Sequence, residues 1–178
     1  MSEDLELLQA IENKHVLEES LDQDDLSVVF SALKGEDMLS IYSAVRIVAA
    51  SDKGLILNVI EDFASFSRLA QPLLITALAS TDFHESYEFL FTLLKDTEVE
   101  SMSNLIIECL VKTDYFVFPY VLHFLGTKDF TFVVRIKKIL LKMGFESLRG
   151  YLIMFPELPY ENIFRQLFGD KNINELNP

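Results

Sequence analysis

Apolar residues recur along this chain in a helical pattern that repeats about every 30 residues. In five stretches they occupy positions i, i+3, i+4 and i+7, which places them on one face of a helix. These stretches start at Leu26, Ile56, Tyr87, Phe118 and Leu148, so successive starts lie 30, 31, 31 and 30 residues apart. Such even spacing predicts that one structural unit is repeated along the chain.

A second helical stretch lies between successive first helices and has three apolar positions of its own. Its equivalent positions in successive repeats are Ala44, Leu74, Ile106 and Ile136; Ile47, Ala77, Cys109 and Ile139; and Val48, Leu78, Leu110 and Leu140. Each second helix is followed by a short break, at Ser51-Asp52, Thr81-Asp82, Thr113-Asp114 and Met143-Gly144. Asp is a favoured N-cap for the next helix, and Gly suits the left-handed conformation at a helix end. The breaks therefore predict joints between successive helical hairpins.

The two ends of the chain differ from this pattern. Leu5, Leu8 and Ile11 predict an N-terminal helix near Glu3 to Asn13, so residues 1–23 are expected to form a capping helix and an acidic linker. A last helix is expected over Pro159 to Phe168, and residues 169–178 lack periodicity and are expected to form a flexible tail. We therefore predict a single helical-repeat domain over residues 1–178.

A pair of antiparallel helices with this period resembles the HEAT-like and armadillo-type helical repeats, over roughly residues 24–168. The resemblance implies an all-α fold, a right-handed α-α superhelix (solenoid) of about five antiparallel helix pairs with a period near 30 residues. Typical HEAT repeats have a proline in the first helix, an aspartate in the turn and a basic residue in the second helix. Pro119, Asp37 with Arg46, and Asp129 with Arg135 match that pattern, and the other repeats depart from it.

Charge and composition narrow the classes of partner. The net charge of the 178 residues is −13, and residues 1–37 alone contain 11 acidic against 2 basic side chains, or −9. An acidic chain repels phosphate backbones, so we expect no nucleic-acid binding. No apolar run approaches the roughly 18 residues that cross a bilayer, so we expect no membrane partner. A single cysteine fits a reducing cytoplasm and predicts a cytoplasmic location.

Partners of such helical stacks usually bind the concave side that the second helices line. The outward positions of these helices become basic in the fourth repeat, where Arg135, Lys138 and Lys142 lie at i, i+3 and i+7. A partner that presents carboxylates, or the acidic N-terminus of another copy, would fit there. The alternative is an ordinary solvated helix face. The predicted partner-binding residues are Arg46, Glu108, Arg135, Lys137, Lys138 and Lys142.

The chemistry of a catalytic or metal site is missing from the sequence. The three histidines have no partner at a zinc-ligand spacing, and the six glycines do not form a phosphate-binding loop. Cys109 shares a column with Ile47, Ala77 and Ile139, which predicts a small core side chain. We therefore expect neither an enzyme, nor a cofactor, nor a metal.

The sequence leaves three functions open. The preferred hypothesis is a non-catalytic scaffold or adaptor for protein-protein interaction. One alternative is an accessory or catalytic HEAT-like protein with a small-ligand pocket among the aromatic residues of repeats 3 and 4; these rings otherwise fill a wide core. The other alternative is a self-assembling module that forms homo-oligomers by pairing its acidic N-terminal half with the basic fourth repeat.

Overall fold

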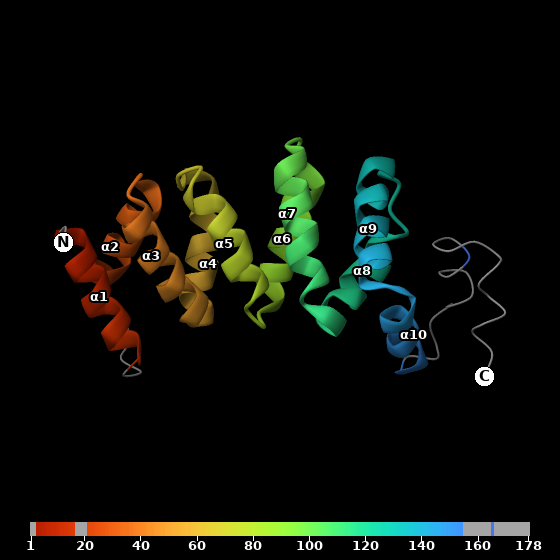
Figure 1. The fold of residues 1–178 in the computed structure, drawn as a ribbon, viewed down its shortest axis with the longest axis horizontal. Coiled ribbons are helices and arrows are strands. Elements are labelled where there is room, and N and C mark those ends of the chain that lie inside the picture. Colours follow the sequence, from red (N-terminus) through yellow and green to blue (C-terminus); the bar gives the residue numbers. More distant parts are fainter. Residues whose placement is uncertain (1–2, 17–20, 155–164, 166–178) are drawn as a thin grey trace. The chain divides into compact units, whose positions relative to one another are not determined.

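The chain is all-helical. The computed structural model describes residues 3–16, 21–154 and 165, and these contain ten α-helices, two short 3-10 helices and no strand (Figure 1). None of the described helices combines the length and the apolar character that a membrane span requires. By their internal contacts the residues divide into two compact units, 1–93 (unit 1) and 94–178 (unit 2), and the boundary between them falls inside one helix.

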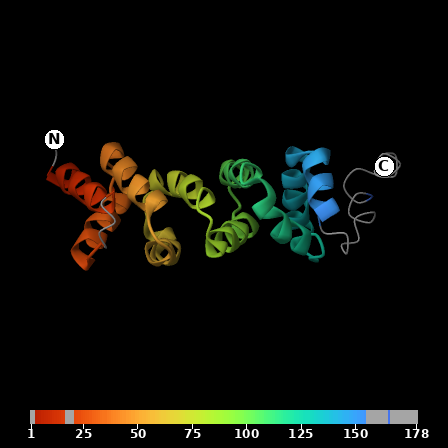
Figure 2. The same ribbon diagram turned by 90° about the horizontal axis from the view of Figure 1, so that it is seen from below.

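Unit 1 consists of helices in two layers. Its elements are α1 (Glu3–Val16), α2 (Gln23–Lys34), α3 (Met38–Ala50), α4 (Lys53–Asp62), the 3-10 helix η1 (Phe63–Ser65), α5 (Ala70–Ala79) and the first part of α6 (His84–Asp96). Helices α1, α3 and α5 lie side by side in one layer, and α2 and α4 lie in the other (Figure 2). Helix α3 contacts α1 on one side and α5 on the other, so it forms the centre of its layer.

A capping box begins α2, and an ion pair connects the N-terminal helix to it. Asp22 accepts hydrogen bonds from the backbone N–H groups of Asp24 and Asp25, and the Asp25 carboxylate accepts one from the N–H of Asp22. The same Asp25 carboxylate is buried and lies 2.9 Å from Lys14 Nζ of α1. The expected N-terminal helix is thus confirmed, and the polar stretch after it provides the cap of α2.

Unit 2 contains the end of α6 and the remaining helices. They are α7 (Glu100–Val111), the 3-10 helix η2 (Asp114–Val117), α8 (Phe118–Phe124), α9 (Phe130–Met143) and α10 (Phe145–Met154). Helix α9 packs against α7, α8 and α10. The predicted helix over Pro159 to Phe168, apart from Arg165, and the predicted tail over 169–178 lie outside the described residues.

The apolar columns of the second helices face the core, as predicted. Helices α3, α5, α7 and α9 are these second helices, and every predicted inward position in them is buried, Cys109 included. Most of the predicted first-helix positions that the structure describes are also buried, whereas Leu26, Phe30, Ile60, Leu122 and Leu125 are half-buried. Phe155 and the side chain of Leu152 lie outside the described part. The helices pack because packing removes these apolar faces from water.

The joints between helices follow the prediction in part. Asp52 caps α4 by accepting a hydrogen bond from Leu55 N at 3.1 Å. Helix α6 begins at His84, two residues beyond Asp82. Pro119 has no N–H, and its ring blocks the carbonyl four residues earlier, so the α-helix cannot extend back through η2 and α8 is short. Gly144 has the predicted positive φ, +87°, although its ψ of 164° is extended and not left-handed helical.

The Asp–Arg pairs that resemble HEAT repeats have different partners here. Asp37 and Asp129 cap α3 and α9, accepting hydrogen bonds from Ser40 N and Phe132 N at 2.9 and 3.0 Å. Arg46 pairs with Glu12 of α1. Arg135 donates hydrogen bonds to backbone carbonyls of α6. These arginines therefore tie a second helix to another helix and not to the turn before it.

Substitution of Gly144 by Ala should lower the free energy of unfolding by about 1–3 kcal/mol, because only glycine adopts this backbone conformation without strain. A Cβ at Gly144 would meet nothing within 4 Å, so the cost arises from the backbone alone. Urea denaturation measures the change. Gly126→Ala is the matched control, because its Cβ would make an ordinary 3.8 Å contact. Equal effects of the two substitutions would contradict the prediction.

Candidate partner-binding surface

The six predicted partner-binding residues are divided between the two units. Arg46 lies on α3 of unit 1, whereas Glu108 lies on α7 and the other four lie on α9 of unit 2. Within unit 2, Glu108, Lys138 and Lys142 are exposed, and Lys137 is half-buried. The structure therefore brings the predicted unit 2 residues to two adjacent helices, since α7 and α9 pack together.

A carboxylate lies among the lysines of α7 and α9. Lys142 Nζ is 2.5 Å from Glu108 Oε1, and both side chains are about half exposed. The hydrogen bond and the charge of Lys142 lower the pKa of Glu108, and the charge of Lys112 lowers it further. Three lysines, Lys112, Lys138 and Lys142, and a single glutamate thus leave an excess of positive charge here.

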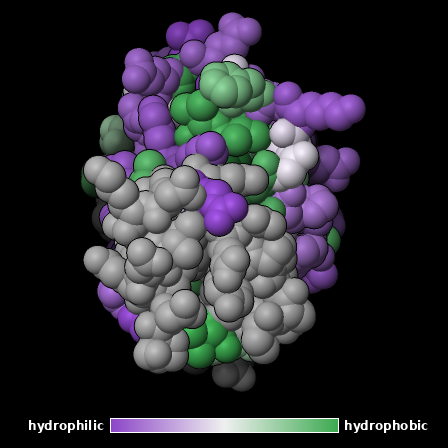
Figure 3. Space-filling model, turned by 90° about the vertical axis from the view of Figure 1, so that its right-hand side faces the viewer, coloured by the Kyte–Doolittle hydropathy of each residue, from purple (hydrophilic) through white to green (hydrophobic). Residues whose placement is uncertain are grey.

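Exposed apolar side chains accompany these lysines along α9. Phe130, Val134 and Leu141 are 79%, 39% and 52% exposed, and with Lys138 they follow the spacing of one helix stripe. Seen from the end of the chain that carries α10, apolar side chains show between hydrophilic ones (Figure 3). We call the following set the α7–α9 surface: Glu108, Lys112, Phe130, Val134, Lys138, Leu141 and Lys142.

Arg135 has an intramolecular role that its predicted outward position did not reveal. It is half-buried, and its Nη1 donates hydrogen bonds to the backbone oxygens of Leu94 and Lys95, the latter at 3.3 Å. Both oxygens belong to the last turn of α6, where carbonyl groups lack helical partners and attract a positive charge. Arg135 therefore joins α9 to the end of α6.

The outer side of α3 and α5 in unit 1 is almost free of charge. Their sequences, MLSIYSAVRIVAA and AQPLLITALA, contain one ionisable group of the Asp, Glu, Lys and Arg types, Arg46. Its guanidinium lies 2.5 Å from Glu12 Oε1 of α1. Leu39, Tyr42 and Leu69 are exposed, and Leu73 is half-buried. We call these four residues the α3–α5 face. None of these four is among the predicted partner-binding residues, although Leu39 and Leu69 occupy equivalent positions 30 residues apart.

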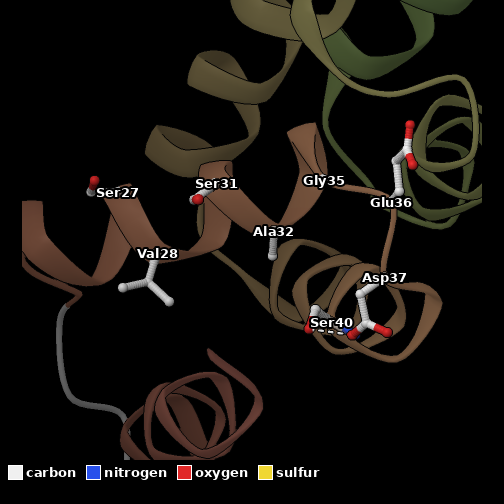
Figure 4. A pocket seen from close by; sticks show the side chains of 8 residues that line it. All are labelled: Ser27, Val28, Ser31, Ala32, Gly35, Glu36, Asp37 and Ser40. Atoms are coloured by element: carbon white, nitrogen blue, oxygen red, sulfur yellow. Dashed lines mark hydrogen bonds between the residues drawn. The ribbon is translucent and has the colours of Figure 1, made fainter. Parts of the chain in front are cut away.

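Two shallow pockets flank α2. One, of about 450 Å³, lies where α2 meets α3, and its lining is drawn in Figure 4: Ser27, Val28, Ser31, Ala32, Gly35, Glu36, Asp37 and Ser40. Asp37 accepts a 2.6 Å hydrogen bond from Ser40 Oγ at its rim. The other, of about 500 Å³, lies between α2 and α4. Both differ in place from the pocket suggested among the aromatic residues of repeats 3 and 4.

The aromatic residues of repeats 3 and 4 divide between core and surface. Tyr87, Phe91 and Phe118 are buried, in line with a core that rings fill, whereas Tyr115 and Phe116 are exposed. The ring of Phe118 stacks on that of Tyr151 with centroids 4.7 Å apart. In the described part of the chain, no group of three metal-ligating side chains comes together.

No family model matches the chain, and neither a curated protein nor a solved structure matches it.

Substitution of Arg135 by Ala should lower the free energy of unfolding by about 1–2 kcal/mol, because the last carbonyls of α6 lose a charged donor. Urea denaturation followed by circular dichroism measures the loss. Lys138→Ala on the same helix is the control, and its exposed side chain should change stability by less than about 0.5 kcal/mol. Similar losses in both variants would show that Arg135 does not have this role.

Substitution of Ser40 by Ala should raise the pKa of the Asp37 carboxyl, because the Ser40 hydroxyl is the main cause of its lowering. A carboxyl with a lowered folded pKa stabilises the fold above its unfolded pKa, and this contribution is lost as the pH falls through the folded pKa. The stability difference between wild type and variant should therefore be largest near neutral pH and vanish in acid. Carbon-detected NMR titration of Asp37 measures the shift, and an unchanged pKa would refute the assignment.

Proposed function

We propose that this protein is a non-catalytic scaffold, a solenoid of HEAT-like helix pairs that binds another protein on the outer side of its second helices. The observation that carries this proposal is the division of α3, α5, α7 and α9 into a buried apolar side and an accessible side. Extended helical surfaces of this kind serve partner binding in repeat proteins. A cytoplasmic location fits the single cysteine.

In unit 2 the α7–α9 surface fits an acidic, partly apolar segment of the partner. Lys112, Lys138 and Lys142 supply positive charge, and Phe130, Val134 and Leu141 supply apolar anchors. Charge complementarity steers association and selects the partner, while apolar side chains provide most of the affinity. Arg135 does not belong to this set, because its guanidinium holds α6.

A second candidate is head-to-tail self-assembly, which the uneven charge of the chain favours. Unit 1 has 17 acidic and 5 basic residues, or −12, whereas unit 2 has 11 and 10, or −1. The acidic unit of one copy would then supply the carboxylates for the α7–α9 surface of the next. Light scattering in low and high salt distinguishes the two candidates, because salt dissociates a charge-driven assembly.

Reversal of charge in the variant Lys138→Glu/Lys142→Glu should weaken the binding of an acidic amphipathic peptide of about 15 residues by at least about tenfold. Fluorescence anisotropy gives the dissociation constant, and affinity capture from cell extract with mass spectrometry then identifies the partner that wild type retains and the variant loses. The melting temperature of the variant should stay close to that of wild type.

The matched control for this experiment is Lys95→Glu/Lys128→Glu, which makes the same change of net charge in unit 2 at exposed lysines outside the α7–α9 surface. It should leave the dissociation constant within about twofold of wild type, since neither lysine belongs to the α7–α9 surface. If both double variants lost the same affinity, net charge alone would explain the loss, and the proposed binding site would be wrong. An unchanged dissociation constant in Lys138→Glu/Lys142→Glu would also contradict the proposed site.

A further inference from the structure

We propose that the α3–α5 face of unit 1 binds a basic amphipathic helix of a partner protein. This inference rests on the proposed scaffold function and names the class of partner for unit 1. It concerns residues other than those of the α7–α9 surface, so the two sites can be tested separately.

Exposed apolar residues in unit 1 are concentrated in one layer. Leu39, Tyr42 and Leu69 are 64%, 49% and 47% exposed. Among the large exposed apolar residues described in this unit, all except Leu57 of α4 belong to the layer of α1, α3 and α5. Isolated exposed leucines are ordinary, but a group of them on two packed helices is typical of a protein-interaction site.

The two helices present their accessible residues in matching rows. On α3 the row runs through Leu39, Tyr42 and Arg46. The second row starts at Leu69, the N-cap residue of α5, and continues on α5 through Leu73 and Thr76. Each row follows a helical spacing of three or four residues, and α3 packs directly against α5. A helix that places apolar side chains at i, i+3, i+4 and i+7 can therefore contact both rows at once.

The surroundings of this face specify the charge of its occupant. Unit 1 has a net charge of −12, yet α3 and α5 contain no carboxylate, and Arg46 is paired with Glu12. The carboxylates that give unit 1 its negative charge therefore belong to sequence outside α3 and α5, among them Glu12 of α1, which pairs with Arg46. An occupant with an apolar stripe and basic flanks would complement both features. A second copy of unit 1 would bring another −12 to the same place, which disfavours pairing of two such faces.

A designed helix tests the proposal. The probe is a fluorescent Leu/Lys peptide of about 18 residues with its leucines on one face, and the control peptide has the same composition with leucines on all faces. The chain should bind the amphipathic peptide more tightly than the control by at least about tenfold. Its affinity should fall as salt increases, because screening weakens the attraction of the lysines to unit 1.

Variants of the chain locate the binding site. Leu39→Ser/Tyr42→Ser/Leu69→Ser should weaken peptide binding by at least about tenfold, because it removes the apolar anchors. Leu57→Ser removes the exposed leucine of α4 and should leave binding unchanged. Circular dichroism checks that the variants fold. The single substitution Tyr42→Arg is a milder change, and its positive charge would repel the basic peptide. Binding that persists in both face variants overturns the proposal, as does equal binding of the two peptides.

Two further outcomes separate this proposal from its alternatives. A mass by light scattering that is dimeric for wild type and monomeric for the triple variant would make a second copy the occupant and overturn the assignment to a basic helix. If the basic peptide fails to bind while the acidic peptide binds the α7–α9 surface, the scaffold function stands and the α3–α5 inference fails. If the acidic peptide alone fails, binding of the basic peptide still supports the α3–α5 face.

Discussion

The structure depends on one constraint: each amphipathic helix has an apolar side that neighbouring helices must cover. Helix α3 illustrates it, because Ile41, Ala44 and Val48 are buried while α1 and α5 pack on its two sides. Full burial of one large aliphatic side chain contributes about 1.5–3 kcal/mol, so every column of such residues fixes the rotation of its helix. The orientation of the outward residues follows from that rotation, and so does the composition of each proposed binding surface.

Local patterns predicted much of the fold because they have local causes. The buried columns follow from helical periodicity, and the caps at Asp52 and Asp129 follow from the hydrogen-bonding capacity of one side chain. Other features follow from constraints that the apolar pattern does not contain. Pro119 shortens α8 to Phe118–Phe124. The division into two units depends on how densely distant helices contact one another, which a period near 30 residues does not encode.

The candidate site was harder to predict than the fold, because its electrostatics depend on residues far apart in sequence. Arg135 meets Leu94 41 residues away, and Lys142 meets Glu108 34 residues away. The row of basic residues on α9 predicted positive charges available to a partner. Two of these residues, Arg135 and Lys142, already have intramolecular partners. The α3–α5 face is recognised by a different feature, the lack of carboxylates in α3 and α5 although the chain has a net charge of −13.

Helix α6 (His84–Asp96) crosses the boundary between the two units, and this has a practical consequence for dissecting the chain. A fragment that stops at Leu93 ends inside a helix, whose last turn then has no continuation. A cut after Asp96 keeps α6 whole, but it separates Arg135 from the carbonyls of Leu94 and Lys95. Either cut therefore removes a stabilising feature: the first interrupts α6, and the second removes the acceptors of Arg135. Overlapping fragments that both retain α6 are the sounder choice.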